Sequence, residues 1–200
     1  MMITAAAQAV VLFIATNIDD IIILSLFFGR GHGQPGTTRR ILLGQYLGFI
    51  AILGTAVIVA VGADAILPDE LLPYFGLIPL GLGVWAAWRS WRNRGEEDND
   101  EAQLQGKRVS VGTVALVTFA NGGDNIGVYV PVFVSISWAS VFAFCIVFLL
   151  LVATLVFTAR WLTSRKPIAE ALERWESILF PTVLIALGVI ILISGGAFGL

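Results

Sequence analysis

The sequence is poor in charged residues, in cysteine and in histidine. Charged side chains make up 13% of its 200 residues, whereas soluble domains hold roughly 25%. The single cysteine, Cys145, excludes a disulfide framework and a thiolate metal cage. With His32 as the single histidine, no buried Ser–His or Cys–His arrangement is available for catalysis. We therefore expect neither an enzyme nor a protein with a resident cofactor, and no nucleic-acid partner.

Long uninterrupted apolar runs dominate the chain instead. Hydrophobic residues make up 58% of it, and their runs are long enough to cross the roughly 30 Å hydrocarbon layer of a bilayer, which takes about 20 helical residues. We therefore predict an all-α membrane protein with six transmembrane helices, the first an uncleaved span rather than a signal peptide. The predicted spans are Ile3–Phe28, Ile41–Ala63, Leu71–Trp88, Val109–Phe133, Trp138–Ala159 and Ile178–Phe198.

Lysine and arginine are absent from every second connector of this arrangement. With six spans, all 12 basic residues fall in the first, third and fifth connectors, which share one side of the membrane. The positive-inside rule makes that side cytoplasmic, which places both termini outside and the chain in the inner (plasma) membrane. A wrong span count would scatter these charges over both sides. For the acidic run Glu96–Glu101 in the third connector we expect a solvated loop.

The two halves of the chain resemble each other. A shift of 104 residues lays Asn17–Asp20 over Asn121–Asp124 and matches both ends of the tetrapeptide, and a shift of 105 lays Gly83 over Gly188. Each half has three spans, and an odd number makes the second half enter the membrane from the opposite side. We therefore predict two inverted-topology three-helix repeats, residues 1–91 and 109–200, joined by a charged cytoplasmic linker, residues 92–108.

Three carboxylates lie well inside the predicted spans. Asp19, Asp20 and Asp124 are the only formal charges there, and an acidic residue at a helix centre costs roughly 2.5–3.5 kcal/mol on insertion scales. Residues three apart share a helix face, so Asn17 lies beside Asp20, and Asn121 beside Asp124. Asp19 points about 100° away from Asp20. It reaches the same place only if the helix is unwound or if it faces a neighbouring span.

Glycine and proline weaken the helix in the fourth span. Gly122-Gly123, Gly127 and Pro131 favour irregular backbone, whose freed carbonyls can coordinate a cation where they line a cavity. Carboxylate, amide and backbone oxygens together suit hard divalent cations such as Mg²⁺, Ca²⁺ or Mn²⁺. The alternative is that the same side chains cap or bridge helices. The predicted metal ligands are Asn17, Asp19, Asp20, Asn121, Asp124 and Asn125.

Five further polar side chains lie near these residues in the spans. For each of them we expect ordinary hydrogen bonding between helices rather than ligation. They are Thr16, Gln45, Tyr46, Thr118 and Tyr129.

The charge of the site suggests a coupling mechanism. Three ionised carboxylates sum to −3, so one bound divalent ion leaves −1. Desolvation and repulsion between like charges both favour a bound proton at such a site when the metal has left. Metal binding then expels protons, which predicts an exchange of metal for H⁺.

Two segments resemble a known family. Thr16–Asp20 (Thr-Asn-Ile-Asp-Asp) and Ala120–Pro131 (Ala-Asn-Gly-Gly-Asp-Asn-Ile-Gly-Val-Tyr-Val-Pro) are similar to the motifs of the cadmium-resistance transporter family, part of the lysine-exporter superfamily. The similarity covers nearly the whole chain in length and span layout. It implies efflux of Cd²⁺ or a related divalent cation from a bacterial cytoplasm. It also implies that the six predicted ligands form the conducting site.

An exporter of amino acids or other small organic cations is the alternative within that superfamily. Its site would also have to accommodate a carboxylate or an aliphatic chain, yet no basic residue lies in any predicted span. The partners we expect are therefore a divalent metal ion as transported substrate and the lipid bilayer. Further copies of the same chain, in a homo-oligomer, are compatible with both of these partners.

Cysteine accessibility in intact cells tests the orientation. Cysteines introduced at Gly33, Asn99 and Ser164 should resist an impermeant thiol reagent, because the connectors that hold them face the cytoplasm. A cysteine at Asp69 should react, because its connector faces outside. Labelling of the Asn99→Cys variant from outside would contradict the orientation.

Overall fold

The regular elements of the described chain are helices. The computed structural model describes residues 2–32, 34–92, 109–163 and 166–197. The predicted linker beyond Arg92, with its acidic run Glu96–Glu101, lies outside these ranges. In chain order the elements are α1 (Met2–Thr16), α2 (Ile18–Arg30), α3 (Thr37–Ile66), the 3₁₀ helix η1 (Asp69–Gly76), α4 (Leu77–Arg92), α5 (Val111–Asn121), α6 (Gly123–Ser135), α7 (Trp138–Leu162) and α8 (Lys166–Ser194).

Each predicted span coincides with one helix or with two consecutive helices. The first corresponds to α1 and α2, the third to η1 and α4, and the fourth to α5 and α6. Three described segments, Thr37–Ile66, Glu70–Trp88 and Trp138–Leu162, are long and apolar enough to cross a membrane, and the bent pair of α1 and α2 makes four. The apolar segments Val111–Asn121 and Pro181–Ser194 are shorter. The count of six spans therefore stays a prediction.

The connector between the fifth and sixth predicted spans, the amphipathic segment Arg160–Glu176, is largely helical. α7 continues to Leu162, and α8 begins at Lys166. Pro167, the second residue of α8, is compatible with this start, because the first turn of a helix does not use its N–H groups for internal hydrogen bonds.

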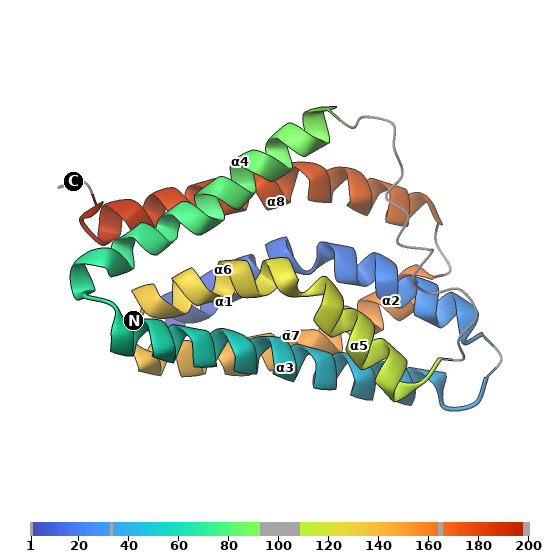
Figure 1. The fold of residues 1–200 in the computed structure, drawn as a ribbon. Helices are drawn as coiled ribbons and strands as arrows, with labels where there is room; N and C mark the ends of the chain where they lie inside the picture. The colour runs from blue at the N-terminus through green and yellow to red at the C-terminus, as the bar shows by residue number, and fades with distance from the viewer. Residues whose placement is uncertain (1, 33, 93–108, 164–165, 198–200) are drawn as a thin grey trace.

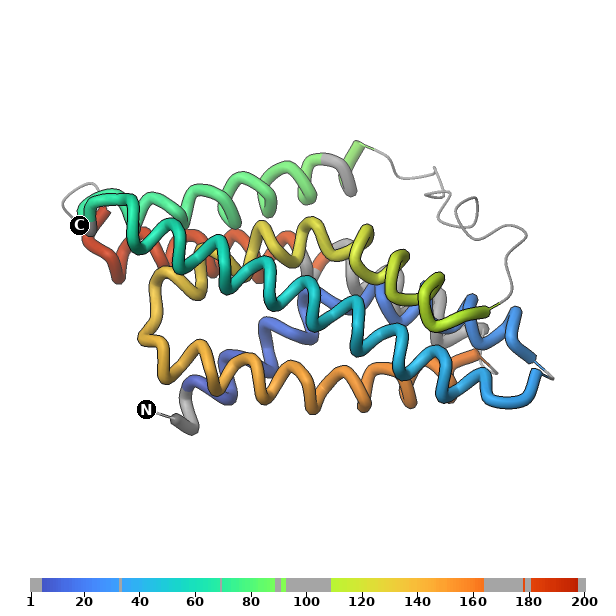
Figure 2. The backbone as a smooth tube through the Cα atoms, turned by 60° about the horizontal axis from the view of Figure 1, so that its bottom comes forward, coloured from blue at the N-terminus to red at the C-terminus, as the bar shows by residue number. Residues whose placement is uncertain are grey.

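The first span is broken at Asn17. The axes of α1 and α2 differ by 57°, and the kink is visible in Figure 2. Asn17 leaves the helical conformation, with φ −128° and ψ 20°, and its side-chain Nδ2 donates to Phe13 O at 2.8 Å. In a continuous helix that carbonyl would accept the backbone N–H of residue 17. The asparagine side chain therefore satisfies the carbonyl that the break would leave without a donor.

The fourth span is interrupted at Gly122, as the glycine pair predicts. The prediction was wrong for Gly127 and Pro131, which lie inside the continuous helix α6. With φ −79°, Gly122 adopts a conformation open to any residue, so its backbone does not require glycine. The space beside Gly122 is taken by the side chain of Ile52 on α3, which would have to shift for a Cβ there, because that Cβ would lie 2.7 Å from Ile52 Cγ1. Figure 1 shows both breaks near the middle of the molecule's length.

The helices form a bundle with one flanking pair. α4 and α8 pack closely on each other and lie along one side of the other six α-helices (Figure 1). Within the bundle α3 packs against α5 and α6, and α7 packs against α1 and α2. The second predicted span of each half therefore contacts the broken first span of the other half.

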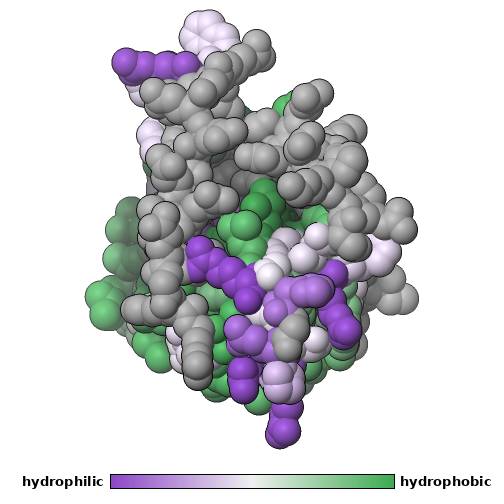
Figure 3. Space-filling model, turned by 90° about the vertical axis from the view of Figure 1, so that its right-hand side faces the viewer, coloured by the Kyte–Doolittle hydropathy of each residue, from purple (hydrophilic) through white to green (hydrophobic). Residues whose placement is uncertain are grey.

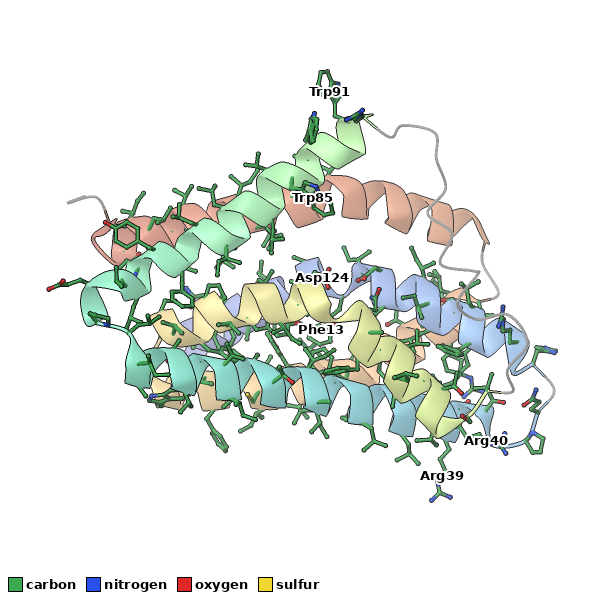
Figure 4. The ribbon with its side chains drawn as sticks, viewed as in Figure 1. Phe13, Arg39, Arg40, Trp85, Trp91 and Asp124 are labelled. Atoms are coloured by element: carbon green, nitrogen blue, oxygen red, sulfur yellow. The ribbon has the colours of Figure 1, made fainter. Side chains whose placement is uncertain are left out.

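Aromatic rings fill the bundle on the α1 and α6 side of the breaks. The ring centroid of Phe13 lies 5.5 Å from that of Phe49 and 5.5 Å from that of Phe148, and Tyr129 lies 5.0 Å from Phe148. All four side chains are buried, and Figure 4 shows Phe13 directed into the bundle. This cluster gives the breaks a rigid, close-packed neighbour.

Hydrophilic residues gather at one end of the molecule. Figure 3 views this end and shows them grouped there. Arg39 and Arg40, near the start of α3, lie at it (Figure 4), while the exposed Asp64 and Glu70 belong to the opposite turn between α3 and η1. The charges of the described residues are thus separated along the helix axes.

Two glycines on α3 set its distance from α5. A Cβ at Gly48 would lie 2.6 Å from Thr118 Cβ and 2.8 Å from Ala115 O, and one at Gly44 would lie 2.7 Å from Val111 O. Small residues four apart let two helices approach closely in a membrane. The close contact between α3 and α5 therefore depends on the absence of side chains at these positions.

A pair of alanine variants on α3 tests this packing. Gly48→Ala should lower the thermal unfolding midpoint in detergent by several degrees, because overpacking costs roughly 1–3 kcal/mol. Gly54→Ala is the matched control, since a Cβ at Gly54 meets no atom within 4 Å. It should leave the midpoint unchanged or raise it slightly, as alanine stabilises a helix relative to glycine. Equal effects of the two variants would contradict this account of the interface.

Candidate cation site

The side chain of Asn121 joins the two halves of the chain at the breaks. Its Nδ2 donates to Asp19 Oδ2 at 2.6 Å and to Asp20 Oδ1 at 3.2 Å. Asn121 is the last residue of α5, and the two aspartates lie in the first turn of α2. Both carboxylates reach this one amide although adjacent residues of a helix point about 100° apart, because Asn121 comes from the other half of the chain and lies against the first turn of α2.

Asp20 is the more buried of these two carboxylates, and both of its oxygens are satisfied. Its side chain is 3% exposed, and Oδ2 accepts from Gln45 Nε2 at 2.9 Å. Thr118 Oγ1 donates to Gln45 Oε1 at 2.6 Å, which fixes the orientation of the glutamine amide. A buried carboxylate requires such partners. The amides of Gln45 and Asn121 therefore hold Asp20 between α3 and α5.

A second group of polar side chains surrounds Asn17. Its Nδ2 faces the carbonyl of Phe13, a group that only accepts hydrogen bonds, and also lies 3.0 Å from Tyr129 Oη. Thr16 Oγ1 lies 2.9 Å from the same hydroxyl. These contacts determine the orientation of the amide, so that Asn17 Oδ1 points away from Phe13 O and Tyr129 Oη. That oxygen is buried and has no hydrogen-bond partner among the described residues.

Asp124 and Asn125 occupy the first turn of α6. Figure 4 places Asp124 at the break of the fourth span, and its Oδ1 accepts from the N–H of Asn125 at 2.8 Å. Its carboxylate is close enough to interact electrostatically with Asp19 and Asp20. Asn125 is 1% exposed, and its Oδ1 is the second buried side-chain oxygen with no partner in the described part of the chain.

The structure brings three of the six predicted ligands into direct contact and shows no hydrogen bond from the side chains of the other three, Asn17, Asp124 and Asn125, to them. Asn121, Asp19 and Asp20 are in direct contact, whereas Asp124 stands apart from the aspartate pair. Among the described residues, no three His, Cys, Asp or Glu side chains form a group that could hold a metal ion. A cation that uses carboxylates from both halves needs amide oxygens as well, and the structure offers two that lack donors.

The polar neighbours expected to bridge helices do so, and two of them also form a hydrogen-bond chain that begins at Asp20. Tyr46 Oη donates to Leu149 O at 2.9 Å and joins α3 to α7, and Tyr129 joins α6 to α1. Gln45 and Thr118 instead continue the hydrogen-bond chain from Asp20. Their importance was underestimated from the sequence. The signal was a glutamine in an otherwise apolar span, one residue from the packing glycine Gly44.

Helix bridging does not account for all of these residues. The hydrogen bonds of Asn121 and Gln45 are of the kind that hold membrane helices together. Buried polar atoms are nearly always hydrogen-bonded, however, so the unpartnered oxygens of Asn17 and Asn125 require another explanation. Neutral oxygens beside carboxylates are the donor set that hard divalent cations prefer.

The comparisons with known proteins assign a family. A search of curated proteins and a search of solved structures found no match. A family model described as cadmium resistance transporter matches residues 13–200 and includes both Thr16–Asp20 and Ala120–Pro131. This match covers most of the chain and confirms the resemblance drawn from the two segments. The chain belongs to the cadmium resistance transporter family.

Proposed function

We propose that this protein exports Cd²⁺ or a related divalent cation through the site at the two helix breaks, in exchange for protons. One observation carries the proposal: Asp19 and Asp20 from the first half meet Asn121 from the second half. A site built by both halves changes its access when the halves move relative to each other, as in transporters with broken helices.

The local backbone supports cation binding at this place. The three aspartates lie in the first turns of α2 and α6, where the helix dipole stabilises negative charge. The buried oxygens of Asn17 and Asn125 add neutral ligands. We propose as ligands the full set of Asn17, Asp19, Asp20, Asn121, Asp124 and Asn125. Oxygen ligands favour hard divalent ions.

Reciprocal contacts support the inverted repeats. A Cβ at Gly83 would lie 2.8 Å from Ile185 Cγ1, and one at Gly188 would lie 2.7 Å from Leu80 Cβ. A shift of 105 residues converts Gly83 into Gly188 and Leu80 into Ile185, so exchanging the halves converts each contact into the other. The packing of α3 on α5 and α6, and of α7 on α1 and α2, follows the same exchange.

We propose the corresponding topology of six spans in the inner membrane. Residues 1–91 and 109–200 form the two repeats, residues 92–108 form a cytoplasmic linker, and both termini lie outside. The grouping of Arg39 and Arg40 at the hydrophilic end (Figures 3 and 4) supports a cytoplasmic assignment for that end.

Carboxamide variants test the site. Asp20→Asn and Asp124→Asn should each reduce Cd²⁺ uptake into inside-out membrane vesicles by roughly tenfold or more, since a charge-assisted contact contributes about 1.5–3 kcal/mol. Protein levels should stay near those of the unaltered chain, because an amide is cheaper in the membrane than a carboxylate. Asp64→Asn, which alters an exposed carboxylate, is the control and should transport normally.

Two results would count against this site. Normal transport by either variant would show that its carboxylate is not a ligand. Loss of both variants from the membrane, with Asp64→Asn retained, would favour helix bridging as the role of these aspartates.

Proton exchange follows from the charge of the site. Without metal, three ionised carboxylates would sum to −3, and desolvation and repulsion between like charges favour bound protons there. A divalent ion that binds the carboxylates then releases these protons. In proteoliposomes, metal flux in one direction should therefore drive proton flux in the opposite direction, which is measured as a change of the internal pH. Asp19→Asn should weaken this coupling more than it weakens metal binding. Metal movement without a proton signal, at a membrane potential clamped to zero, would favour a uniporter or channel.

A further inference from the structure

One amide nitrogen lies within hydrogen-bond distance of two carboxylates from the first turn of α2. Asn121 Nδ2 lies 2.6 Å from Asp19 Oδ2 and 3.2 Å from Asp20 Oδ1. A cation bound by both oxygens would need distances of roughly 2.3–2.6 Å to each, so it would have to occupy the place of this nitrogen. The amide hydrogens carry partial positive charge and point at the carboxylates. Asn121 therefore competes directly with a cation for the same pair of oxygens.

We propose that Asn121 is a latch which the transported cation displaces: its amide joins α5 to α2 directly when the carboxylates are free, and cation binding replaces these hydrogen bonds with contacts through the ion. The proposal rests on the proposed function and specifies how loading of the site is coupled to movement of the helices. On displacement the amide turns over, so that Oδ1 faces the cation and becomes a ligand. The same side chain thus donates in one arrangement and accepts in the other.

Three amide side chains donate hydrogen bonds at the breaks, those of Asn17, Gln45 and Asn121, and their surroundings differ. Gln45 is held at both ends, by Asp20 and by Thr118. Asn17 is held by Phe13 O and by Tyr129 Oη, and both side chains are 1% exposed.

Asn121 is only partly buried and ends α5 at the residue before the break. An amide at a helix end can turn without disturbing hydrogen bonds inside a helix. Of the three, Asn121 is therefore the one placed to move.

The consequence for transport lies in what the latch connects. α2 belongs to the first half and α5 to the second, and the Asn121 bonds join them at the site itself. A cation that displaces the amide removes these bonds and supplies its own contacts to the carboxylates. Loading therefore replaces the two direct hydrogen bonds between the halves with contacts through the ion, and departure of the cation restores the hydrogen bonds. This is the differential interaction that a ligand needs in order to shift a conformational equilibrium.

Replacement of the amide by an isosteric carboxylate tests the latch. Asn121→Asp keeps the size and the oxygen ligand but removes the NH₂ donor. The full-length variant, purified in detergent, should bind Cd²⁺ and Mn²⁺ roughly tenfold or more tightly than the unaltered protein, because two charge-assisted hydrogen bonds no longer oppose binding. Its thermal unfolding midpoint without metal should fall, and the rise on adding metal should be larger. Competition with a fluorescent chelator gives the dissociation constants.

Asn125→Asp is the matched control for the added charge. It places a carboxylate on the neighbouring helix without removing a bond to Asp19 or Asp20. If both variants tighten binding equally, charge alone explains the effect and the latch is rejected. Equal or weaker binding by Asn121→Asp, relative to the unaltered protein, also rejects it. Absence of metal binding by the unaltered protein would instead remove the proposed function, and the latch with it.

A folding defect in Asn121→Asp is informative as well. The latch predicts that this variant is destabilised only while the carboxylates lack a cation. Purification with Mn²⁺ throughout should then yield a folded, monodisperse protein. Failure to recover folded protein in Mn²⁺, with Asn125→Asp recovered under the same conditions, would overturn the proposal.

Discussion

The carboxylate of Asp20 sits where water hardly reaches it, and the packing of three helices depends on satisfying it. At 3% exposure it needs donors from the protein, and they come from Gln45 on α3 and Asn121 on α5. Gly48 lets α3 and α5 approach closely enough for both amides to reach it. A side chain at Gly48 would therefore disturb the hydrogen bonds of the site as well as the helix contact.

The two spans are broken at corresponding places by different chemistry. At Asn17 a side-chain amide takes over the carbonyl of Phe13, while at Gly122 the missing side chain makes room for Ile52 of α3. In both spans an acidic first turn follows the break, so carboxylates meet the positive ends of half-helices. The two halves share the position of the break and of the aspartates that follow it. The local cause of the break differs between them.

Hydropathy was sufficient to locate the helices but not the contacts between them. The predicted spans correspond to helices because apolar length is read directly from the sequence, whereas hydropathy alone did not show that α8 begins as early as Lys166. The aspartates and Asn121 were predicted from charge and repetition. The break at Asn17 was not, since no glycine or proline marks it. The hydrogen bond from Gln45 to Asp20 depends on the close approach of α3 to α5, which the sequence did not show.

The proposed latch also bears on which ions enter. To occupy the place of Asn121 Nδ2, a cation has to replace two hydrogen bonds to carboxylates, each contributing roughly 1.5–3 kcal/mol. Its attraction to the carboxylates scales with its charge, so a monovalent ion of similar size brings half the Coulomb energy against the same opposing bonds. An amide between two carboxylates thus favours divalent ions by charge. In the proposed site, selection among divalent ions then falls to the oxygens of Asn17 and Asn125, which are buried and have no hydrogen-bond partner among the described residues.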